Sequence, residues 1–410
     1  MPKMKPTEKT KKNSSKVSSR LSLGERVPKL RFPGFEGEWE ELKIHEIFEV
    51  TRGYVLSTKD THSRPDSKYC YPVYSSQTKD DGLMGYYSEF LYKDAITWTT
   101  DGANAGTVHY RTGCFYCTNV CGVLLSNKGY ANKCVSEILN AVAKRYVSYV
   151  GNPKLMNNVM REIPLVLPNK FEQLKISDFL SLLDSRIAAQ RKLVKLLKKH
   201  KRGVIEQIFM QHLGLGKNSE KWNVVELRNL FSKVVRRNKD GRVKNVITNS
   251  AEFGLIPQRD FFDKSIAVEG NTDGYYIIHT GDFVYNPRKS TAAPFGPFNR
   301  YTGTEDGIIS PLYTCLVPNE KVNPEYLAWY FRSTAWHRYV YDNGSQGARH
   351  DRVNMTDDLL FGIPVLLPPI AVQDKIAKCL NVIDARWSSA NKALTYLEDM
   401  KRGLLQQLFV

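Results

Sequence analysis

An internal repeat constrains the fold of this chain more than any other feature of its sequence. Residues 163–210 align with residues 363–410 at a constant offset of 200 without gaps, and 17 of the 48 aligned pairs are identical. Such a repeat indicates that one structural unit occurs twice. The blocks upstream also align at their starts, where Trp39 matches Trp222 at an offset of 183. The sequence therefore predicts two similar halves, the second with the longer block.

Each half consists of a large block rich in aromatic residues and a long segment of helical character. The block ends in a short apolar strand bounded by prolines, Ile163–Pro168 or Ile363–Pro368. Apolar residues then recur at alternating steps of four and three, the heptad pattern of helices that pack along one seam. The seam positions are Ile176, Leu180, Leu183, Ile187, Gln190, Val194, Leu197, Lys201, Val204 and Ile208, and in the second half Ile376, Leu380, Ile383, Trp387, Ala390, Leu394, Leu397, Lys401, Leu404 and Leu408.

A helix of about 40 residues is about 60 Å long and cannot cover its apolar seam alone. Each helix could pack on its own domain, or the two helices could pack against each other. Two matching helices in one chain favour the second arrangement, as an antiparallel pair with the two blocks at opposite ends. The predicted fold class is α+β, with two mixed α/β globular domains separated by an antiparallel coiled coil and related by a pseudo-twofold internal repeat.

The blocks are expected to be mixed α/β domains, because short apolar and aromatic runs alternate with Gly, Asn and Asp turns. The expected strands are 71–74, 95–98, 115–116, 275–278 and 282–285, and the expected helices are 133–149 and 324–339. The predicted organisation is a basic disordered tail (1–27), a first domain (28–168), a first helix (169–212), a second domain (213–368) and a second helix (369–410).

The chain has 59 Lys and Arg against 42 Asp and Glu, a formal charge of +17, which suggests a polyanionic partner. The excess is unevenly distributed. Residues 1–20 hold seven bases and one acid, and residues 169–211 hold ten bases and four acids. The two blocks are nearly neutral, with 17 bases and 16 acids in residues 21–168 and 19 bases and 17 acids in residues 212–368. The total charge is therefore weak evidence that the blocks themselves bind a polyanion.

The seven cysteines form an odd set, most simply interpreted as reduced thiols of a cytoplasmic protein. Cys114, Cys117 and Cys121, with His109 nearby, resemble half of a zinc site, and the alternative is that they are apolar thiols on a strand. The chain has no apolar run long enough to span a membrane and no apolar segment typical of a secretory signal near its start. We expect a cytoplasmic location.

Motifs for catalysis are not found in the sequence. It contains no phosphate-binding G-x-x-x-x-G-K-[ST], no H-E-x-x-H zinc motif and no G-x-S-x-G nucleophile motif, and it lacks the D/N-P-P-Y/F motif of amino-methyltransferases. Its eight histidines are scattered. We therefore expect a chain without catalytic, cofactor-binding or metal-binding residues.

The repeat resembles the specificity (S) subunit of Type I restriction–modification systems. The marks of this resemblance are the opening Pro28–Phe35 with Trp39, the two I-P-x-x-L-P strands, Gln173 and Gln373 near the helix starts, and the Lys-Arg-Gly and Gln-x-Phe motifs near both helix ends. The resemblance covers about residues 28–410 and offers no role for the basic tail.

The resemblance implies a non-catalytic subunit that reads DNA in the cytoplasm of a bacterial or archaeal cell. Each block would be a target recognition domain for one half of a bipartite, asymmetric duplex target, and the helices would fix the gap between the halves. Two modification subunits would dock on the chain and methylate adenine at N6 with S-adenosylmethionine. Restriction subunits, if present, would use ATP and Mg to translocate and cleave unmodified DNA. Two similar readers in one chain also match the twofold logic of dimeric DNA-binding proteins.

Polar loops next to the predicted strands supply the candidate DNA-reading residues, because amide and basic side chains can pair with base edges and phosphates. Each loop could instead be a solvated turn without a DNA contact. The candidates in the first domain are Ser75, Ser76, Gln77, Lys79, Thr100, Asn104, Asn152, Lys154 and Asn157. The candidates in the second domain are Arg236, Arg237, Arg288, Lys289, Ser345, Gln346 and Arg349.

The role of the basic stretch in the first helix remains open. It could be a solvated face, could approach DNA between the half-sites, or could meet the modification subunits.

Two alternatives to a specificity subunit also remain open. The chain could be a self-sufficient restriction or methyltransferase enzyme, which would need a motif that the sequence lacks. It could also be a coiled-coil scaffold that binds only proteins.

Overall fold

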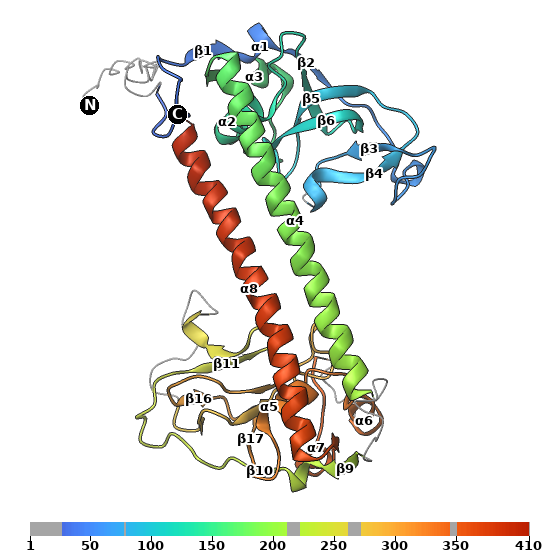
Figure 1. Ribbon diagram of the computed structural model, residues 1–410, viewed down its shortest axis with the longest axis vertical. Coiled ribbons are helices and arrows are strands. Elements are labelled where there is room, and N and C mark those ends of the chain that lie inside the picture. The colour runs from blue at the N-terminus through green and yellow to red at the C-terminus, as the bar shows by residue number, and fades with distance from the viewer. Residues whose placement is uncertain (1–26, 78, 211–221, 261–271, 345–350, 410) are drawn as a thin grey trace, which may run out of the picture. The chain divides into compact units, whose positions relative to one another are not determined.

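The computed structural model describes residues 27–77, 79–210, 222–260, 272–344 and 351–409. The chain forms two compact units, of which unit 1 extends to Ala189 and resumes at Thr395, and unit 2 comprises Gln190–Leu394. The chain has two long helices, α4 (Lys170–Phe209) and α8 (Ile370–Leu408). One part of each helix belongs to unit 1 and the other part belongs to unit 2 (Figure 1). The predicted tail lies outside the described residues, except for Val27.

Unit 1 contains a six-stranded sheet with the strand order β2-β7-β5-β6-β3-β4. All neighbouring strands are antiparallel except β3 and β6, which run parallel. A separate two-stranded sheet pairs β1 with β8, the apolar strand predicted before the first helix. The elements are β1 (Glu40–Lys43), α1 (Ile44–Ile47), β2 (Glu49–Arg52), β3 (Tyr71–Tyr74), β4 (Leu83–Tyr87), β5 (Tyr92–Thr99), β6 (Val108–Cys117), β7 (Cys121–Leu125), α2 (Lys133–Ala143), α3 (Asn157–Arg161) and β8 (Pro164–Leu167).

The main core of unit 1 lies between this sheet and helix α2. Ile96, Trp98 and Leu124 project from the sheet into the same buried cluster as Val135 and Leu139 of α2. The Trp98 ring lies directly on the backbone of β7, where a Cβ on the glycine at position 122 would come within 2.1 Å of it. Because α2 covers this face, the opposite face of the sheet remains for other contacts.

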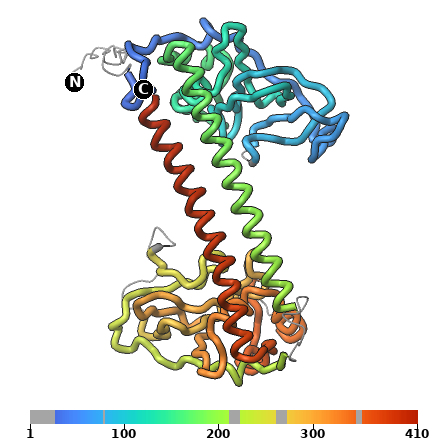
Figure 2. Tube along the Cα trace, viewed as in Figure 1, coloured from blue at the N-terminus to red at the C-terminus, as the bar shows by residue number. Residues whose placement is uncertain are grey.

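Within unit 1, the first part of α4 and the last part of α8 pack against each other in antiparallel orientation. Leu180 of α4 and Leu408 of α8 belong to the main core, and Lys401 Nζ lies 2.7 Å from Asp184 Oδ1. The described chain begins beside the end of α8, since the Leu30 N–H donates to the Gln407 carbonyl at 2.9 Å (Figure 2). The opening segment is thereby tied to the last turn of the second helix.

Unit 2 is built on a four-stranded antiparallel sheet, β10-β17-β14-β15, and three two-stranded sheets, β11-β12, β13-β16 and β9-β18. The last of these pairs the second predicted apolar strand with the first strand of its domain, as β8 pairs with β1 in unit 1. The elements are β9 (Asn223–Glu226), β10 (Phe231–Lys233), β11 (Ile247–Ser250), β12 (Gly254–Pro257), β13 (Tyr276–Ile278), β14 (Phe283–Tyr285), β15 (Phe298–Arg300), β16 (Gly307–Ile309), β17 (Thr314–Pro318), α5 (Pro324–Tyr330), α6 (His337–Asn343), α7 (Asp357–Phe361) and β18 (Pro364–Leu367).

Aromatic rings fill the core of unit 2. Phe298 and Phe331 lie 3.8 Å apart between ring centroids, and Phe209 at the end of α4 packs edge-on against Tyr326 and Tyr330 of α5. Such edge-on pairs add to the free energy gained by burying the rings. The helix end is therefore part of this domain's core.

Within unit 2, the parts of α4 and α8 are again antiparallel. Lys201 Nζ of α4 lies 2.6 Å from Asp384 Oδ1 of α8, the pair that matches Lys401 and Asp184 at the repeat offset. The two alternatives for covering the apolar seam of a long helix, packing on a domain and packing against the other helix, therefore occur together in each unit. The helix ends pack on a domain core, and they also pack against each other.

Both predicted domain helices are shorter in the structure than expected. The helix expected over 133–149 ends at Ala143 and is followed by a single 3-10 turn. The helix expected over 324–339 is two helices, α5 and α6, with a break between them. The break has a physical cause, because the N–H and hydroxyl of Thr334 both donate to the Glu206 carboxylate of α4.

The strands predicted from the apolar and aromatic runs are present at β3, β5, β6, β13 and β14. No helix among the described residues is both long enough and apolar enough to cross a membrane.

Candidate nucleic-acid interface

A small polar cavity lies in unit 1 on the face of the six-stranded sheet. Its floor comes from β5 and β6, where Thr97 is directly opposite His109 and Ala95 is opposite Arg111. Its rim comes from the loop after β3 and the loop after β5. The cavity has a volume of about 210 Å³, and its lining includes Ser75, Gln77, Thr97, Thr99, Asn104, His109 and Arg111. Hydroxyl, amide, imidazole and guanidinium groups therefore converge on one space.

Arg111 is the most buried charged group of this cavity, with only 7% of its surface exposed. Its Nε donates to Thr97 Oγ1 at 3.1 Å, and Nη2 donates to the Asp81 carbonyl at 2.7 Å. The guanidinium also lies 3.7 Å from the centroid of the Tyr74 ring. Among the described residues, no carboxylate comes close enough to form an ion pair with it. Burial lowers the pKa of Arg111, but guanidinium groups stay charged in proteins, so the cavity holds an unneutralised cation.

His109 is the neutral neighbour of this cation. Burial, and then the positive charge of Arg111, lower the pKa of His109 to about 4. The imidazole is therefore uncharged at neutral pH, with one ring nitrogen as a donor and the other as an acceptor. The floor of the cavity thus combines a fixed cation with a neutral group that can accept or donate a hydrogen bond.

The loop over the cavity has a strained backbone. Asp80 and Asp81 both have positive φ, 49° and 51°, a conformation that non-glycine residues rarely adopt. Two bonds hold it, from the Ser75 N–H to the Gly82 carbonyl at 2.8 Å and from Arg111 to the Asp81 carbonyl. Strain of this kind persists only where the surrounding structure over-determines it, and it clusters at functional sites.

Three of the predicted DNA-reading residues line this cavity, and a fourth, Ser76, is bonded to one of them. Ser75 and Gln77 line it from the first loop, and Asn104 lines it from the second. Asn104 Nδ2 donates to the Ser76 carbonyl at 3.2 Å, which joins the two loops, while the amide of Gln77 donates to the Leu83 carbonyl. Lys79 begins the 3-10 turn of the loop, and the structure does not describe its side chain.

The other predicted residues of unit 1 surround the second loop or lie apart from it. Thr100 is buried, and its carbonyl accepts from the Leu155 N–H at 2.9 Å, so the loops at 100–104 and 152–155 are bonded together. Lys154 is exposed and lies 3.9 Å from the carboxylate of Asp101. Asn152 is exposed. Asn157 starts α3, and its amide donates to the Thr51 carbonyl at 3.4 Å, away from the cavity lining.

In unit 2, two of the predicted arginines, Arg236 and Arg237, are bound to residues of their own domain. Arg236 binds the carboxylate of Asp282, which is buried. Arg237 stacks on the Tyr276 ring at 4.5 Å, and its Nη1 donates to the Gly274 carbonyl at 2.6 Å. Burial raises the pKa of Asp282. The hydrogen bond from the His279 N–H and the positive charge of Arg236 act in the opposite direction and offset part of this rise. These arginines are thus largely committed to partners within the domain.

The loop after β14 carries the more exposed cation of unit 2. Arg288 is 69% exposed, and its Nε lies 3.9 Å from Asp351 Oδ2. The Lys289 N–H donates to the Asp351 carbonyl at 2.8 Å, so this loop is bonded to the segment just after the third predicted loop. The predicted residues Ser345, Gln346 and Arg349 of that third loop lie outside the described residues.

Sequence reasoning missed the floor of the unit 1 cavity and a buried amide cluster in unit 2. In that cluster Asn299 Nδ2 donates to Asn249 Oδ1 at 2.7 Å, and Asn249 Nδ2 donates to the Val284 carbonyl at 2.9 Å. The available signal for the floor was the polar alternation Thr97, Thr99 and His109, Arg111 inside otherwise apolar strands. Alternate residues of a strand share one face, so this pattern indicates a polar strip on the sheet.

The cysteine group considered as half of a zinc site packs as apolar thiols. Cys117 and Cys121 belong to a buried cluster with Phe115, and burial raises the pKa of Cys121 to about 11. Among the described residues no set of three His, Cys, Asp or Glu side chains is arranged to hold a metal ion. Cys70 in unit 1 and Cys379 in unit 2 are exposed.

A larger hollow of about 650 Å³ lies elsewhere in unit 1, lined by residues of α1, β2 and the loop after β7, with both acidic and basic side chains. It includes none of the predicted DNA-reading residues. The smaller cavity is therefore the better candidate for recognition.

Residues 36–199 match the family model described as the Type I restriction modification DNA specificity domain. A putative type I specificity subunit N-terminus from Mycoplasma pneumoniae is 39% identical over 141 residues, which are 34% of this chain and 74% of that relative. Another putative type I specificity subunit of the same organism is 25% identical over 383 residues, 89% of this chain and 94% of the relative. For five further M. pneumoniae relatives the match spans 43% to 59% of their own length.

The fold is also similar to solved structures. The crystal structure of a Type I restriction–modification S subunit from M. genitalium superposes with a TM-score of 0.61 at 16% identity. The superposition covers 94% of this chain and 99% of that one. At this identity the likeness concerns the fold alone, and it extends over both units and both long helices.

Proposed function

Because the chain belongs to the type I restriction–modification specificity subunits, we propose that it reads a bipartite duplex DNA target, one half with each recognition domain. A specificity subunit is the DNA-recognition component of its system and carries no catalytic activity of its own. The two domains differ in their polar surface residues, so the two half-sites differ in sequence.

The observation that carries this proposal is the duplicated framework around two different surfaces. Gln173 Nε2 donates to the Pro168 carbonyl at 2.8 Å, and Gln373 Nε2 donates to the Pro368 carbonyl at the same distance. The ion pairs of Lys401 with Asp184 and of Lys201 with Asp384 are also duplicated. The framework is repeated down to single hydrogen bonds and ion pairs. This repetition supports two equivalent binding positions on one DNA duplex, as in dimeric DNA-binding proteins.

We further propose that α4 and α8 form an antiparallel coiled coil that acts as the spacer and relates the domains by a pseudo-twofold axis. The antiparallel packing of the helix parts inside each unit supports this arrangement. A spacer of fixed length would set the number of base pairs between the half-sites, because the register of the two helices cannot slide without breaking both ion pairs. About 60 Å of helix corresponds to a gap of one or more DNA turns.

In unit 1, the proposed reading surface is the polar cavity with its two loops. The amides of Gln77 and Asn104 suit the N6 and N7 edge of adenine, and the fork of Arg111 suits O6 and N7 of guanine. In unit 2, Arg288 is the leading candidate because it is exposed on a loop that the fold anchors. The near-neutral domains would supply specificity, whereas phosphate contacts supply most of the affinity.

The partners follow from the family and belong to the proposal. Two modification subunits dock on the chain and methylate adenine at N6 with S-adenosylmethionine, which they bind themselves. Restriction subunits, where present, use ATP and Mg for translocation and cleavage. This chain binds none of these cofactors in the proposed complex.

The deciding experiment is methylome sequencing of a host that expresses this chain with its modification subunit. We expect N6-methyladenine at one split motif with two different halves and a fixed gap. Exchanging residues 28–165 for those of another specificity subunit should change one half only. A continuous motif, or no adenine methylation, would contradict the proposal, and a change in both halves would contradict the one-domain, one-half assignment.

A further inference from the structure

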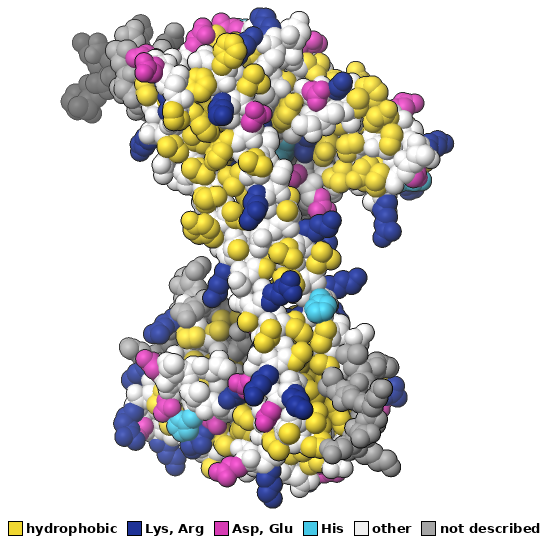
Figure 3. Space-filling model, viewed as in Figure 1, with side chains coloured by type: hydrophobic (Ala, Val, Ile, Leu, Met, Phe, Trp, Pro, Cys, Tyr) yellow, Lys and Arg dark blue, Asp and Glu magenta, His cyan; other side chains and the backbone are white. Residues whose placement is uncertain are grey.

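A strip of basic side chains lies along α4 in unit 2, formed by Lys192, Lys195, Lys198, Lys199 and Arg202, and is called here the basic stripe. All five side chains are exposed. Among the described residues, none of the five has a carboxylate within 4.0 Å. Figure 3 shows Lys and Arg side chains projecting from the helix surface in this region. The stripe is therefore a run of solvated cations without ion-pair partners in the part of the chain that the structure describes.

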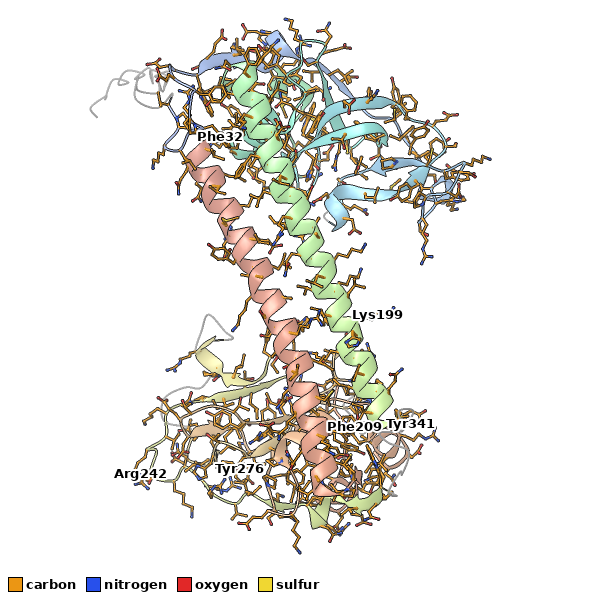
Figure 4. The ribbon with its side chains drawn as sticks, viewed as in Figure 1. Phe32, Lys199, Phe209, Arg242, Tyr276 and Tyr341 are labelled. Atoms are coloured by element: carbon orange, nitrogen blue, oxygen red, sulfur yellow. The ribbon has the colours of Figure 1, made fainter. Side chains whose placement is uncertain are left out.

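The stripe faces away from the other long helix. At about 100° per residue its five members fall within an arc of about 120° on the helix. Lys201 lies on the other side of α4, where it binds Asp384 and sits 4.1 Å from the centroid of the Trp387 ring of α8. Figure 4 shows Lys199 pointing away from α8. The stripe thus presents an open surface, while Lys201 serves the helix pair.

Helix stability does not explain the stripe. Like charges at spacings of three and four residues repel each other, at about 0.2–0.5 kcal/mol for each pair. The repeat offers an internal comparison, because the same positions of α8 are Lys392, Thr395, Glu398, Asp399 and Arg402, whose charges cancel. There Arg402 pairs with Asp399 at 2.8 Å. The same fold thus accommodates side chains with no net charge at these positions, and the positive charge on α4 needs another reason.

We propose that the basic stripe binds DNA phosphates in the unread gap, next to the half-site read by the unit 2 domain. The inference rests on the proposed function. The basic stripe would supply the phosphate contacts that the nearly neutral domains lack, because such contacts provide affinity without sequence information. The stripe spans about 15 Å, and duplex DNA carries one charge per about 1.7 Å, so every cation of the stripe has a phosphate to meet.

DNA fits the stripe better than a docked protein subunit does. Two copies of one modification subunit would meet both repeats in the same way, and a surface used for their docking should occur on both helices. The stripe occurs on α4 only. Phosphate contacts act additively and independently of sequence, so they need no counterpart on the second helix.

The test compares the complete complex of this chain and its modification subunits with a variant in which all five stripe residues are replaced by Gln. The measurement is the slope of log affinity against log salt concentration on a duplex that carries the target. At about 0.9 per phosphate contact, the slope should fall in magnitude by about 4, and affinity at 0.15 M salt should fall about 100-fold or more. The methylated motif should not change.

A matched control removes the same charge from the tail, with Lys3, Lys5, Lys9, Lys11 and Lys12 replaced by Gln. We expect the salt slope of this control to remain close to that of the unaltered complex. An equal fall in slope for both variants would overturn the proposal, because the effect would then reflect total charge and not the stripe.

A second arm locates the contact. Neutral methylphosphonates in the gap of the duplex should weaken binding by the unaltered complex and should have little further effect on the stripe variant, because the two changes remove the same interaction. An unchanged slope overturns the proposal, and so does loss of subunit assembly in sedimentation with normal DNA binding by the assembled fraction. Failure of the proposed function looks different: the unaltered complex would then show no preference for the target over a scrambled duplex.

Discussion

Arg111 in unit 1 and Arg236 in unit 2 are both packed against their domains, but they differ in what surrounds the charge. Arg111 bonds to a hydroxyl and a carbonyl and stacks on Tyr74, and no carboxylate of the described residues forms an ion pair with it. Arg236 binds the buried carboxylate of Asp282. A cation held by neutral dipoles keeps its full charge for a ligand, whereas a cation paired with a carboxylate is largely neutralised. One duplicated framework therefore supports a buried cation without a neutralising carboxylate in unit 1 and an arginine neutralised by a buried carboxylate in unit 2.

The largest expected effect follows from replacing Arg111 by Met. Loss of the guanidinium should weaken reading of the half-site of unit 1, with target methylation falling about 10- to 100-fold, because one bidentate base contact provides about 1–3 kcal/mol of discrimination. Arg111→Lys keeps the charge without the fork and should give an intermediate loss. Methylation rates on targets altered in one half at a time provide the measurement.

The matched control is the double variant Arg236→Met with Asp282→Asn in unit 2, which removes an arginine together with the carboxylate that neutralises it. Its effect should be smaller and confined to the other half-site. If Arg111→Met relaxed both half-sites equally while the complex remained folded by circular dichroism, the contrast between the units would be lost.

The second prediction concerns acid stability. The pKa of His109 is lowered to about 4 in the folded chain, against about 6.5 when unfolded, so between these values only the unfolded chain takes up the proton. Stability should therefore fall as the pH falls through this window, by up to about 3 kcal/mol near pH 4. His109→Gln should remove this part of the pH dependence in urea unfolding of unit 1.

His279→Gln in unit 2 is the control, since the His279 side chain is half-exposed and hydrogen-bonded to Asp306. Its acid profile should stay like that of the unaltered chain. An unchanged profile for His109→Gln would show that the imidazole is protonated in the folded domain, and the unit 1 cavity would then carry a second cation.

The third prediction tests the shared framework. Gln173→Ala and Gln373→Ala each remove a buried amide that bonds to the preceding proline carbonyl, and each should lower the free energy of unfolding by about 1–3 kcal/mol. Equal losses, measured by denaturant unfolding, would support a common framework beneath unlike surfaces. A loss in one variant only would show that the two junctions have diverged as well.

The smallest effect is expected from the duplicated ion pairs. Lys401→Met leaves Asp184 with Lys133 at 2.7 Å, whereas among the described residues Asp384 keeps no other ion-pair partner after Lys201→Met. Lys201→Met should therefore be the more destabilising, by about 1 kcal/mol, as expected for a partly buried pair. Double-mutant cycles with the two aspartates measure the difference. Equal coupling energies would mean that Lys133 contributes nothing to the pair in unit 1.

The sequence predicted the framework well because the framework is written as periodic and repeated patterns. The seam positions Ile176, Leu180, Ile376 and Leu380 are buried in the structure, and the two proline-bounded segments form strands β8 and β18 where predicted. Heptad spacing and strand alternation are local properties, so a single sequence is enough to find them.

The cavity could be predicted only in part. The two loops with Ser75, Gln77 and Asn104 stood out as polar turns, but their meeting over Arg111 depends on the parallel pairing of β3 with β6, a long-range contact. Arg111 lies outside the strands predicted from the sequence. Its alternation with His109 is a weak local signal, because the burial of its side chain depends on long-range strand pairing. The break between α5 and α6 escaped prediction for a similar reason, since it depends on Glu206 of a distant helix.

The distribution of the cysteines has a practical consequence for spectroscopy. Cys70 of unit 1 and Cys379 of unit 2 are exposed, while Cys117, Cys121, Cys134 and Cys315 are buried. Burial raises the pKa of the buried thiols, which keeps them protonated and slow to react with maleimides. With the half-buried Cys114 replaced by Ser, the chain would carry one reactive thiol in each unit. A donor and an acceptor dye on these two native positions would then report the separation of the units before and after DNA is added.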